Sequence, residues 1–175
     1  MNDIIRAMEE RRSVRKYRPD MPKKEDLELI AQAGLWAASG RGMQDCKTII
    51  VTDPAVRARF VEANRKAGGF PEGADPFYGA PVIMAVIAAK DRITNVCDGS
   101  LVIGNMMLAA HSLGLGSIWI HRAKEEFEQP EFKQLLKDLG IEGEWEGVGH
   151  CAVGYMDCDL PARTERKDGR AFWIG

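Results

Sequence analysis

Residues 81–88 read Pro-Val-Ile-Met-Ala-Val-Ile-Ala, an unbroken apolar run of the kind found in the central strand of a sheet. Because such a strand is apolar on both faces, it needs cover from both sides. Residues 96–113 follow with a pattern that is apolar nearly all round, which predicts a helix that lies inside the protein. Together the two segments predict an α/β protein built around a covered sheet.

Weaker patterns on either side extend the same alternation of helices and strands. Further strands are expected over residues 48–52, 116–120 and 150–155, and helices over 2–10, 23–38, 54–67 and 124–139, the last restarted at Pro130. The alternation implies helices on both faces of the sheet, although periodicity does not give the strand order. Residues 68–79 are rich in Gly, Pro, Asp and Glu and are expected to form a loop. Residues 160–175 carry weak signals and are expected to be either disordered or packed on a neighbouring subunit.

The composition is that of an ordinary soluble protein. The chain has 175 residues, of which 45% are hydrophobic and 29% charged, which suits one domain over residues 1–175 with a proper core. The formal net charge is only −2. This balance argues against a dedicated nucleic-acid-binding protein, because such binding needs a broad basic face.

The cysteines and the N-terminus favour a reducing, cytoplasmic setting. The four cysteines are scattered without the spacing of a disulfide framework or a zinc site, so neither a disulfide nor a metal is expected. The first residues lack the apolar core of a signal peptide. The longest apolar run, residues 101–110, is interrupted by Gly104 and Asn105 and is too short to span a bilayer, so no membrane contact is expected.

A basic cluster lies directly after the first predicted helix. Residues 11–17 read Arg-Arg-Ser-Val-Arg-Lys-Tyr, which places three guanidinium groups and a hydroxyl within five residues. The planar fork of arginine suits bidentate contacts with phosphate, so the cluster indicates a phosphorylated ligand. A solvated surface or a nucleic-acid patch would explain the same run, and the cluster alone does not decide among the three.

Several signals occur in one order along the chain. They are Arg11-Arg12-Ser13-Val14-Arg15, Ala38-Ser39-Gly40-Arg41-Gly42-Met43-Gln44, Gly114-Leu115-Gly116-Ser117-Ile118-Trp119, Val153-Gly154-Tyr155 and Arg166-Lys167. This series resembles the FMN-dependent nitroreductase family, and the likeness extends over nearly the whole chain. The resemblance implies a nitroreductase-like three-layer α/β/α sandwich, of α+β type, with a small central mixed sheet flanked by helices. It also implies an intertwined homodimer with two FMN molecules at the subunit interface. In that dimer residues 96–113 form the central helix, and the tail of about residues 160–175 reaches over the partner.

The resemblance also assigns the FMN-binding residues. The FMN phosphate and ribityl chain match Arg11, Arg12, Ser13 and Arg15. The turn that approaches the flavin from the second subunit matches Ser39, Gly40, Arg41 and Gly42. The strand end that lies against the isoalloxazine matches Trp119, Ile120 and His121. The late basic residue that returns to the phosphate matches Arg166, with Arg163 placed to assist it.

Two features depart from the family pattern. Gly42 stands where many relatives have asparagine, and Gln44-Asp45-Cys46 replaces a common Gln-Pro-Trp. Losing the asparagine removes a side-chain contact near the flavin. The segment 68–79 also leaves little room for an elaborate lid, so the substrate pocket is expected to be open.

The activity implied by the resemblance is that of an FMN-dependent oxidoreductase that uses NADH or NADPH in a ping-pong cycle. The nicotinamide passes hydride to the flavin N5 and leaves, and a small electron acceptor, such as a nitroaromatic or a quinone, then takes its place. No catalytic side chain is required, although His121 could donate a proton. The alternative is a flavin-binding protein with little turnover that serves FMN storage, sensing or delivery.

Overall fold

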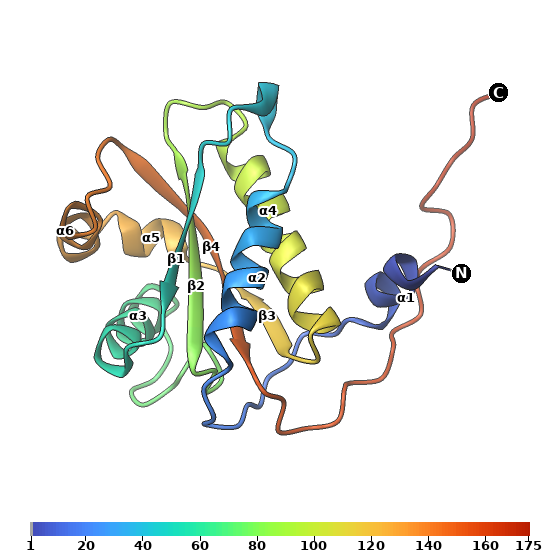
Figure 1. The fold of residues 1–175 in the computed structure, drawn as a ribbon, viewed down its shortest axis with the longest axis horizontal. Helices are drawn as coiled ribbons and strands as arrows, with labels where there is room; N and C mark the ends of the chain where they lie inside the picture. Colours follow the sequence, from blue (N-terminus) through green and yellow to red (C-terminus); the bar gives the residue numbers. More distant parts are fainter. Residues whose placement is uncertain (1) are drawn as a thin grey trace.

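A four-stranded antiparallel sheet lies at the centre of the chain in the computed structural model, which describes residues 2–175 (Figure 1). Its strands, in spatial order, are β1 (Cys46–Val51), β2 (Val82–Ala89), β4 (Trp145–Gly154) and β3 (Gly116–Ile120). The apolar run that predicted a central strand is β2, which pairs with β1 on one side and β4 on the other. The prediction of a central strand is therefore confirmed.

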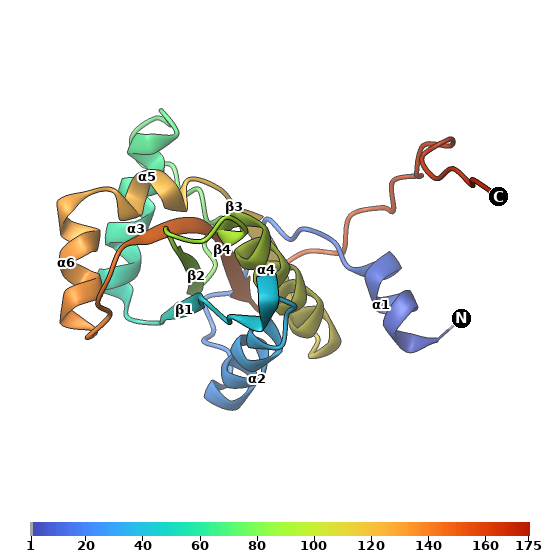
Figure 2. The same ribbon diagram turned by 90° about the horizontal axis from the view of Figure 1, so that it is seen from above.

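Helices cover both faces of this sheet (Figures 1 and 2). One layer contains α2 (Lys24–Leu35) and α4 (Asn95–Ser112), and the other contains α3 (Pro54–Ala67), α5 (Ala123–Phe127) and α6 (Pro130–Asp138). Alternate residues of β2 serve the two layers: Met84 packs with the α2 and α4 side chains, whereas Ile83 packs with those of α3, α5 and α6. This two-sided burial explains why β2 has no polar face, and it confirms the three-layer α/β/α class.

The predicted helix boundaries follow from local chemistry. The carboxylate of Asp53 accepts hydrogen bonds from the Ala55 and Val56 amides, both at 2.9 Å, and Pro54 occupies the first helical position of α3. The Asn2 side chain caps α1 (Asp3–Glu10) in the same way. These starts agree with the sequence-based expectation.

Strand β4 begins five residues earlier than predicted, because its first half contains glycines that hide the strand pattern. A Cβ at Gly147 would lie 2.1 Å from the Ala123 carbonyl oxygen, and one at Gly149 would lie 2.8 Å from the Trp119 ring. Both positions therefore need glycine for close packing. The register between β2 and β4 also shifts at this point, between Val86 and Ile87.

The mixed character expected of the sheet is confined to one bridge. The four strands pair antiparallel, and the parallel pairing joins Ser13 to Ser117 outside the regular strands. A second bridge, between Tyr17 and Met156, is antiparallel. The two bridges fasten the basic segment 11–17 alongside β3 and the end of β4.

Helix α4 is buried on one side only within the chain. Val102, Ile103 and Met106 face the sheet, whereas Leu101 is 50% exposed and Val96 is 47% exposed. The expectation that this helix lies wholly inside is therefore not met by one chain alone. No helix of residues 2–175 is long and apolar enough to cross a membrane.

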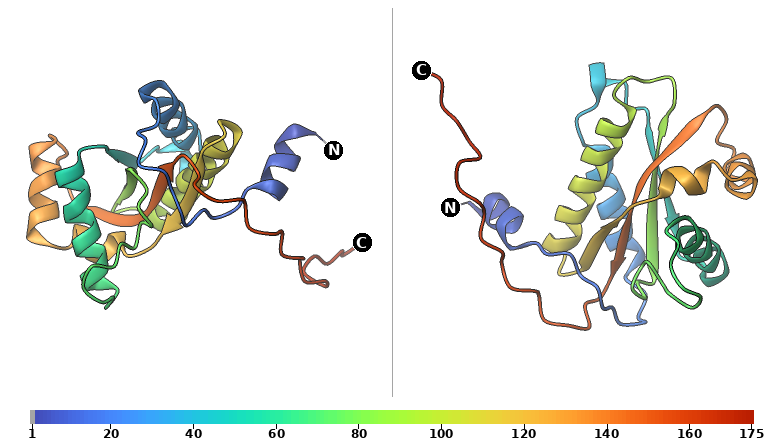
Figure 3. Two further views of the ribbon diagram at one scale, coloured as in Figure 1. Left: turned by 90° about the horizontal axis from the view of Figure 1, so that it is seen from below. Right: turned by 180° about the vertical axis from the view of Figure 1, so that it is seen from behind.

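The two chain ends project from the three layers on the same side (Figures 2 and 3). The tail of residues 160–175 passes helix α1, to which an ion pair of 2.9 Å between Arg163 and Glu9 joins it, and then runs away from that helix. The tail ends in an exposed Phe172-Trp173-Ile174, in which Trp173 is 98% exposed.

Candidate functional site

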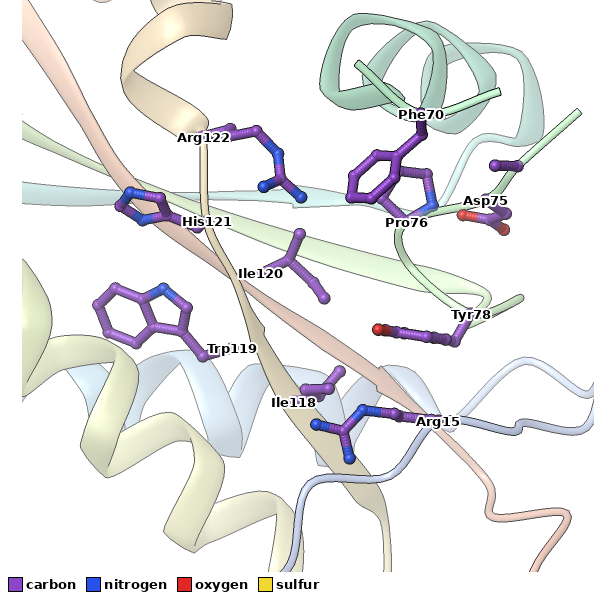
Figure 4. A pocket seen from close by; sticks show the side chains of 11 residues that line it. Arg15, Phe70, Asp75, Pro76, Tyr78, Ile118, Trp119, Ile120, His121 and Arg122 are labelled. Atoms are coloured by element: carbon purple, nitrogen blue, oxygen red, sulfur yellow. The ribbon is translucent and has the colours of Figure 1, made fainter. Parts of the chain in front are cut away.

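A cavity of about 410 Å³ lies where three segments meet: the basic segment, the loop before β2 and the end of β3 (Figure 4). Its lining consists of Arg15, Phe70, Ala74, Asp75, Pro76, Tyr78, Ile118, Trp119, Ile120, His121 and Arg122. Its volume is typical of small-molecule sites. The structure thus brings together four residues that the sequence analysis had selected, namely Arg15, Trp119, Ile120 and His121.

The sheet edge positions Arg15. The amide of Val14 donates to the Ser117 carbonyl at 3.1 Å, and the Val14 side chain is buried in the core. Arg15 comes next, and its guanidinium carbon lies 5.9 Å from the centre of the Tyr78 ring. Within the described chain Arg15 has no carboxylate partner, so its positive charge remains available to a ligand.

The two arginines before it differ in their surroundings. The Nη1 of Arg12 donates to the backbone carbonyls of Glu9 at 2.7 Å and Arg11 at 2.8 Å, so Arg12 closes the end of α1. The Nη1 of Arg11 is buried and, among the buried side-chain nitrogens and oxygens of residues 2–175, is the one without a hydrogen-bond partner. Such an atom is costly unless a ligand satisfies it.

A buried polar network supports the back of the cavity. Asn64, Glu126 and His150 are all fully buried. The carboxylate of Glu126 accepts from Asn64 Nδ2 at 2.5 Å and contacts His150 Nε2 at 2.9 Å. The Nδ1 of His150 lies 3.2 Å from the Ile120 carbonyl oxygen, so both ring nitrogens of this histidine have a partner within the protein.

This network orients two peptide groups at the end of β3. His150 contacts the Ile120 carbonyl, and Asn64 Nδ2 donates to the His121 carbonyl at 2.8 Å. In a trans peptide the C=O and N–H groups point in opposite directions, so the amides of His121 and Arg122 point away from the network. Neither amide donates to an acceptor within residues 2–175. Two adjacent donors are therefore free at the cavity wall.

The cavity is electropositive. Its carboxylate, Asp75, is neutralised by Arg57 at 2.5 Å and accepts from the amides of Phe77 and Gly79. Arg15 and Arg122, by contrast, have no acidic partner in the described residues. An anionic or electron-rich ligand is the natural complement of this lining.

The predicted serine–glycine turn lies elsewhere in the chain. It forms a short 3-10 turn, η1 (Gly40–Gly42), at the end of α4 remote from α1, where Figure 1 shows it in cyan. The Gly40 amide donates to both carboxylate oxygens of Asp98, at 3.0 and 3.1 Å, and Ser39 Oγ accepts from the Gln44 amide at 3.0 Å. Arg41 and Gly42 adopt positive φ values of 54° and 68°. One chain therefore does not bring Ser39, Gly40, Arg41 and Gly42 to the Arg15 cavity.

Two further hollows adjoin this turn, the larger of about 500 Å³ and lined by residues 35–39, Gly42 and Gln44. Cys46 lines the smaller one. Burial, with the charges of Asp98 and Asp45, raises the pKa of the Cys46 thiol to about 11, so the thiol stays protonated and unreactive at neutral pH. No cluster of residues suited to bind a metal occurs within residues 2–175.

The late arginines do not reach the cavity within this chain. Arg163 is paired with Glu9, and Arg166 lies in the exposed tail without an ion pair in the described structure. Their predicted contact with a phosphate remains a prediction.

Comparison with known proteins identifies the family. A model described as Nitroreductase family matches residues 8–155. The chain belongs to the nitroreductase family. A Bacteroides fragilis nitroreductase crystallised with bound FMN is similar over the full length of both chains, with 26% identity and a TM-score of 0.88.

Curated relatives within the nitroreductase family point the same way. A putative NADH dehydrogenase/NAD(P)H nitroreductase of Archaeoglobus fulgidus is 26% identical over 142 residues, which cover 78% of this chain and 77% of that protein. An FMN reductase (NAD(P)H) of Bacillus subtilis is 30% identical over 166 residues, covering 81% of this chain and 66% of its own length.

Sequence reasoning missed several residues of this nitroreductase-family cavity. Phe70 and Tyr78 lie in the segment expected to be a loop, and Arg122 follows a strand end without any motif. The supporting network was missed as well, because its three members are separated by 62 and 24 residues. The signal that marks Arg122 is conformational: its φ of 76° is unusual for a residue other than glycine.

Proposed function

We propose that this chain is an FMN-dependent oxidoreductase that takes electrons from NADH or NADPH and delivers them to a small acceptor. The observation that carries the proposal is the electropositive cavity of about 410 Å³. Arg15 and Arg122 line it without an acidic partner in the described residues, and the backbone amides of His121 and Arg122, which also line it, donate to no acceptor there. Relatives whose names include FMN and NAD(P)H support it.

The residues present fit FMN. A phosphate would satisfy the orphaned Nη1 of Arg11, and Ser13 and Arg15 lie within the same short segment. Arg12 contributes with the part of its guanidinium that does not close α1. The strand end Trp119-Ile120-His121 would lie against the ring system, with the free amides of His121 and Arg122 as donors to its polar edge.

The redox chemistry belongs to the cofactor and not to the side chains of the protein. FMN, when bound, supplies a position, N5, that accepts hydride and gives it up again. The protein then has to hold the cofactor in one orientation and to admit the electron donor and the electron acceptor one after the other. Such alternate binding at one site is the basis of a ping-pong cycle. A nitroaromatic or a quinone fits such a site, and no catalytic side chain is assigned.

A homodimer would complete the site. The uncovered side of α4 and the exposed Trp36, at 81%, leave an apolar surface that a second copy can bury. If two α4 helices pack antiparallel across a twofold axis, the η1 turn of one protomer approaches the Arg15 cavity of the other. Ser39, Gly40, Arg41 and Gly42 would then reach the cofactor from the partner, and the tail with Arg163 and Arg166 would lie over the partner. The four free cysteines suit a cytoplasmic location.

The absorption spectrum of the purified protein tests this function. We expect a yellow protein whose flavin band bleaches under anaerobic NADH or NADPH and returns when a quinone is added. A flavin that is bound but never reduced by either nucleotide would refute the enzyme and favour the alternative of FMN storage, sensing or delivery. A protein that takes up no FMN on reconstitution would refute both.

A further inference from the structure

Arg122 is a charged residue of the cavity to which the proposed flavin site gives no side-chain role. It follows β3 directly and adopts a left-handed backbone with φ 76° and ψ 12°. For a residue with a Cβ this backbone conformation is unfavourable, so the surrounding structure must hold it in place. Figure 4 shows its side chain at the end of the cavity opposite Arg15.

Two contacts fix the guanidinium of Arg122. Its Nε donates to Asn64 Oδ1 at 3.2 Å, which ties it to the buried network, and its Cζ lies 4.8 Å from the centre of the Phe70 ring. Gly68 makes room for this stack, since a Cβ there would lie 2.5 Å from Phe70 Cε2 and 3.0 Å from Arg122 Nε. The arginine is therefore held in one orientation before any ligand arrives.

The terminal nitrogens of Arg122 have no partner of their own. No carboxylate of the described chain pairs with this arginine, and Asp75, the acidic residue of the cavity, is already neutralised by Arg57. A preoriented guanidinium with two free N–H edges matches a carboxylate, to which it can donate two parallel hydrogen bonds. Phe70, Tyr78 and Trp119 line the same cavity and suit a planar ring.

We propose that Arg122 binds an anionic substituent of the electron acceptor, so that the enzyme prefers planar aromatic acceptors that carry a carboxylate. This inference rests on the proposed function, because it concerns the ligand that is reduced in the same cavity. Arg15, at the other end, is left to the cofactor.

Matched pairs of probes test the preference. We expect 4-nitrobenzoate to exceed 4-nitrobenzamide in kcat/KM by about tenfold, as for one charge-assisted contact. Benzoate should likewise perturb the flavin absorbance of the oxidised holoenzyme at concentrations about tenfold lower than benzamide does. The Arg122→Gln variant should bring both ratios close to one, and Arg122→Lys should keep part of them, because the charge remains but the planar fork is lost.

Arg59→Gln provides the matched control. Arg59 is exposed on α3 and away from the cavity, and its replacement changes the net charge by the same amount. We expect this variant to keep the wild-type ratios. If Arg59→Gln lowers the carboxylate-to-amide ratios as much as Arg122→Gln does, the preference is a long-range effect of net charge and the proposal is overturned.

An alternative anionic ligand for Arg122 is the 2′-phosphate of the electron donor NADPH. If Arg122 binds that phosphate, Arg122→Gln will lower the ratio of NADPH to NADH activity and leave the acceptor ratio unchanged, which overturns the proposal. A wild-type enzyme that is reduced by NAD(P)H but does not discriminate between the two nitro compounds would also overturn it, with the proposed function intact. A protein that is never reduced would overturn the proposed function and this inference together.

Discussion

Replacing Glu126 by alanine should destabilise the protein strongly, because the Glu126 carboxyl group contacts two other fully buried polar side chains. The change leaves Asn64 Nδ2 without its contact at 2.5 Å and His150 Nε2 without its contact at 2.9 Å. A buried polar group left without a partner costs about 1–3 kcal/mol, and Glu126→Ala leaves two such groups, on Asn64 and His150. We therefore expect the free energy of unfolding to fall by about 2–6 kcal/mol, a large part of the about 5–15 kcal/mol typical of a domain.

Urea unfolding at a fixed protomer concentration, with and without FMN, measures this loss. The neighbouring Glu125→Ala is the matched control, since Glu125 is exposed and its removal should change the stability by less than about 0.5 kcal/mol. Glu126→Gln keeps the shape and one acceptor, so its loss should be smaller than that of alanine. A loss below about 1 kcal/mol for Glu126→Ala would refute the reasoning that the network is a single satisfied unit.

Three other predictions concern the cofactor, the thiols and the subunit interface. The double variant Arg11→Ala, Arg15→Ala should weaken FMN binding at least about tenfold in a fluorescence titration, because charge-assisted contacts contribute about 1.5–3 kcal/mol each; an unchanged Kd contradicts the phosphate assignment. A maleimide at pH 8 should label the exposed Cys158 rapidly and Cys46 slowly, since burial raises the pKa of Cys46 from 9.0 to about 11. The Cys46 rate should rise about tenfold per pH unit up to about pH 11, and a rate that is flat with pH contradicts this origin. Leu101→Asp places a charge on the open side of α4 and should convert a dimer to monomers in sedimentation velocity; a dimer that persists excludes this face as the interface.

Periodicity predicted the parts of the fold that depend on local pattern. The two-sided burial of β2, the start of α3 at Pro54 and the position of β3 all follow from apolar spacing and capping chemistry. The early start of β4 did not, because Gly147 is dictated by the approach of Ala123 from another element. Strand order is equally a matter of long-range packing that no local pattern encodes.

The candidate site likewise contains residues that sequence motifs could predict and residues that only the folded structure reveals. Arg15 and the strand end up to His121 could be selected from motifs, and the structure brings them to one cavity. Arg122 could not, since its role depends on a left-handed backbone and on contacts with Asn64 and Phe70, which are distant in sequence. The sequence also did not predict that η1 lies away from this cavity within one chain, because that distance depends on how α4 packs in the folded protein.

The pairing of Ser13 with Ser117 has a consequence beyond ligand binding. Strand β3 is the last in the order β1-β2-β4-β3, and one of its sides would offer unpaired amides and carbonyls to other chains. The basic segment shields that border through the bridge and the Val14 amide. Proteolytic removal of the first seventeen residues would thus take away Arg11, Arg12 and Arg15, the proposed phosphate ligands, and also expose the free edge of β3. We therefore expect loss of the flavin colour and loss of solubility to occur together.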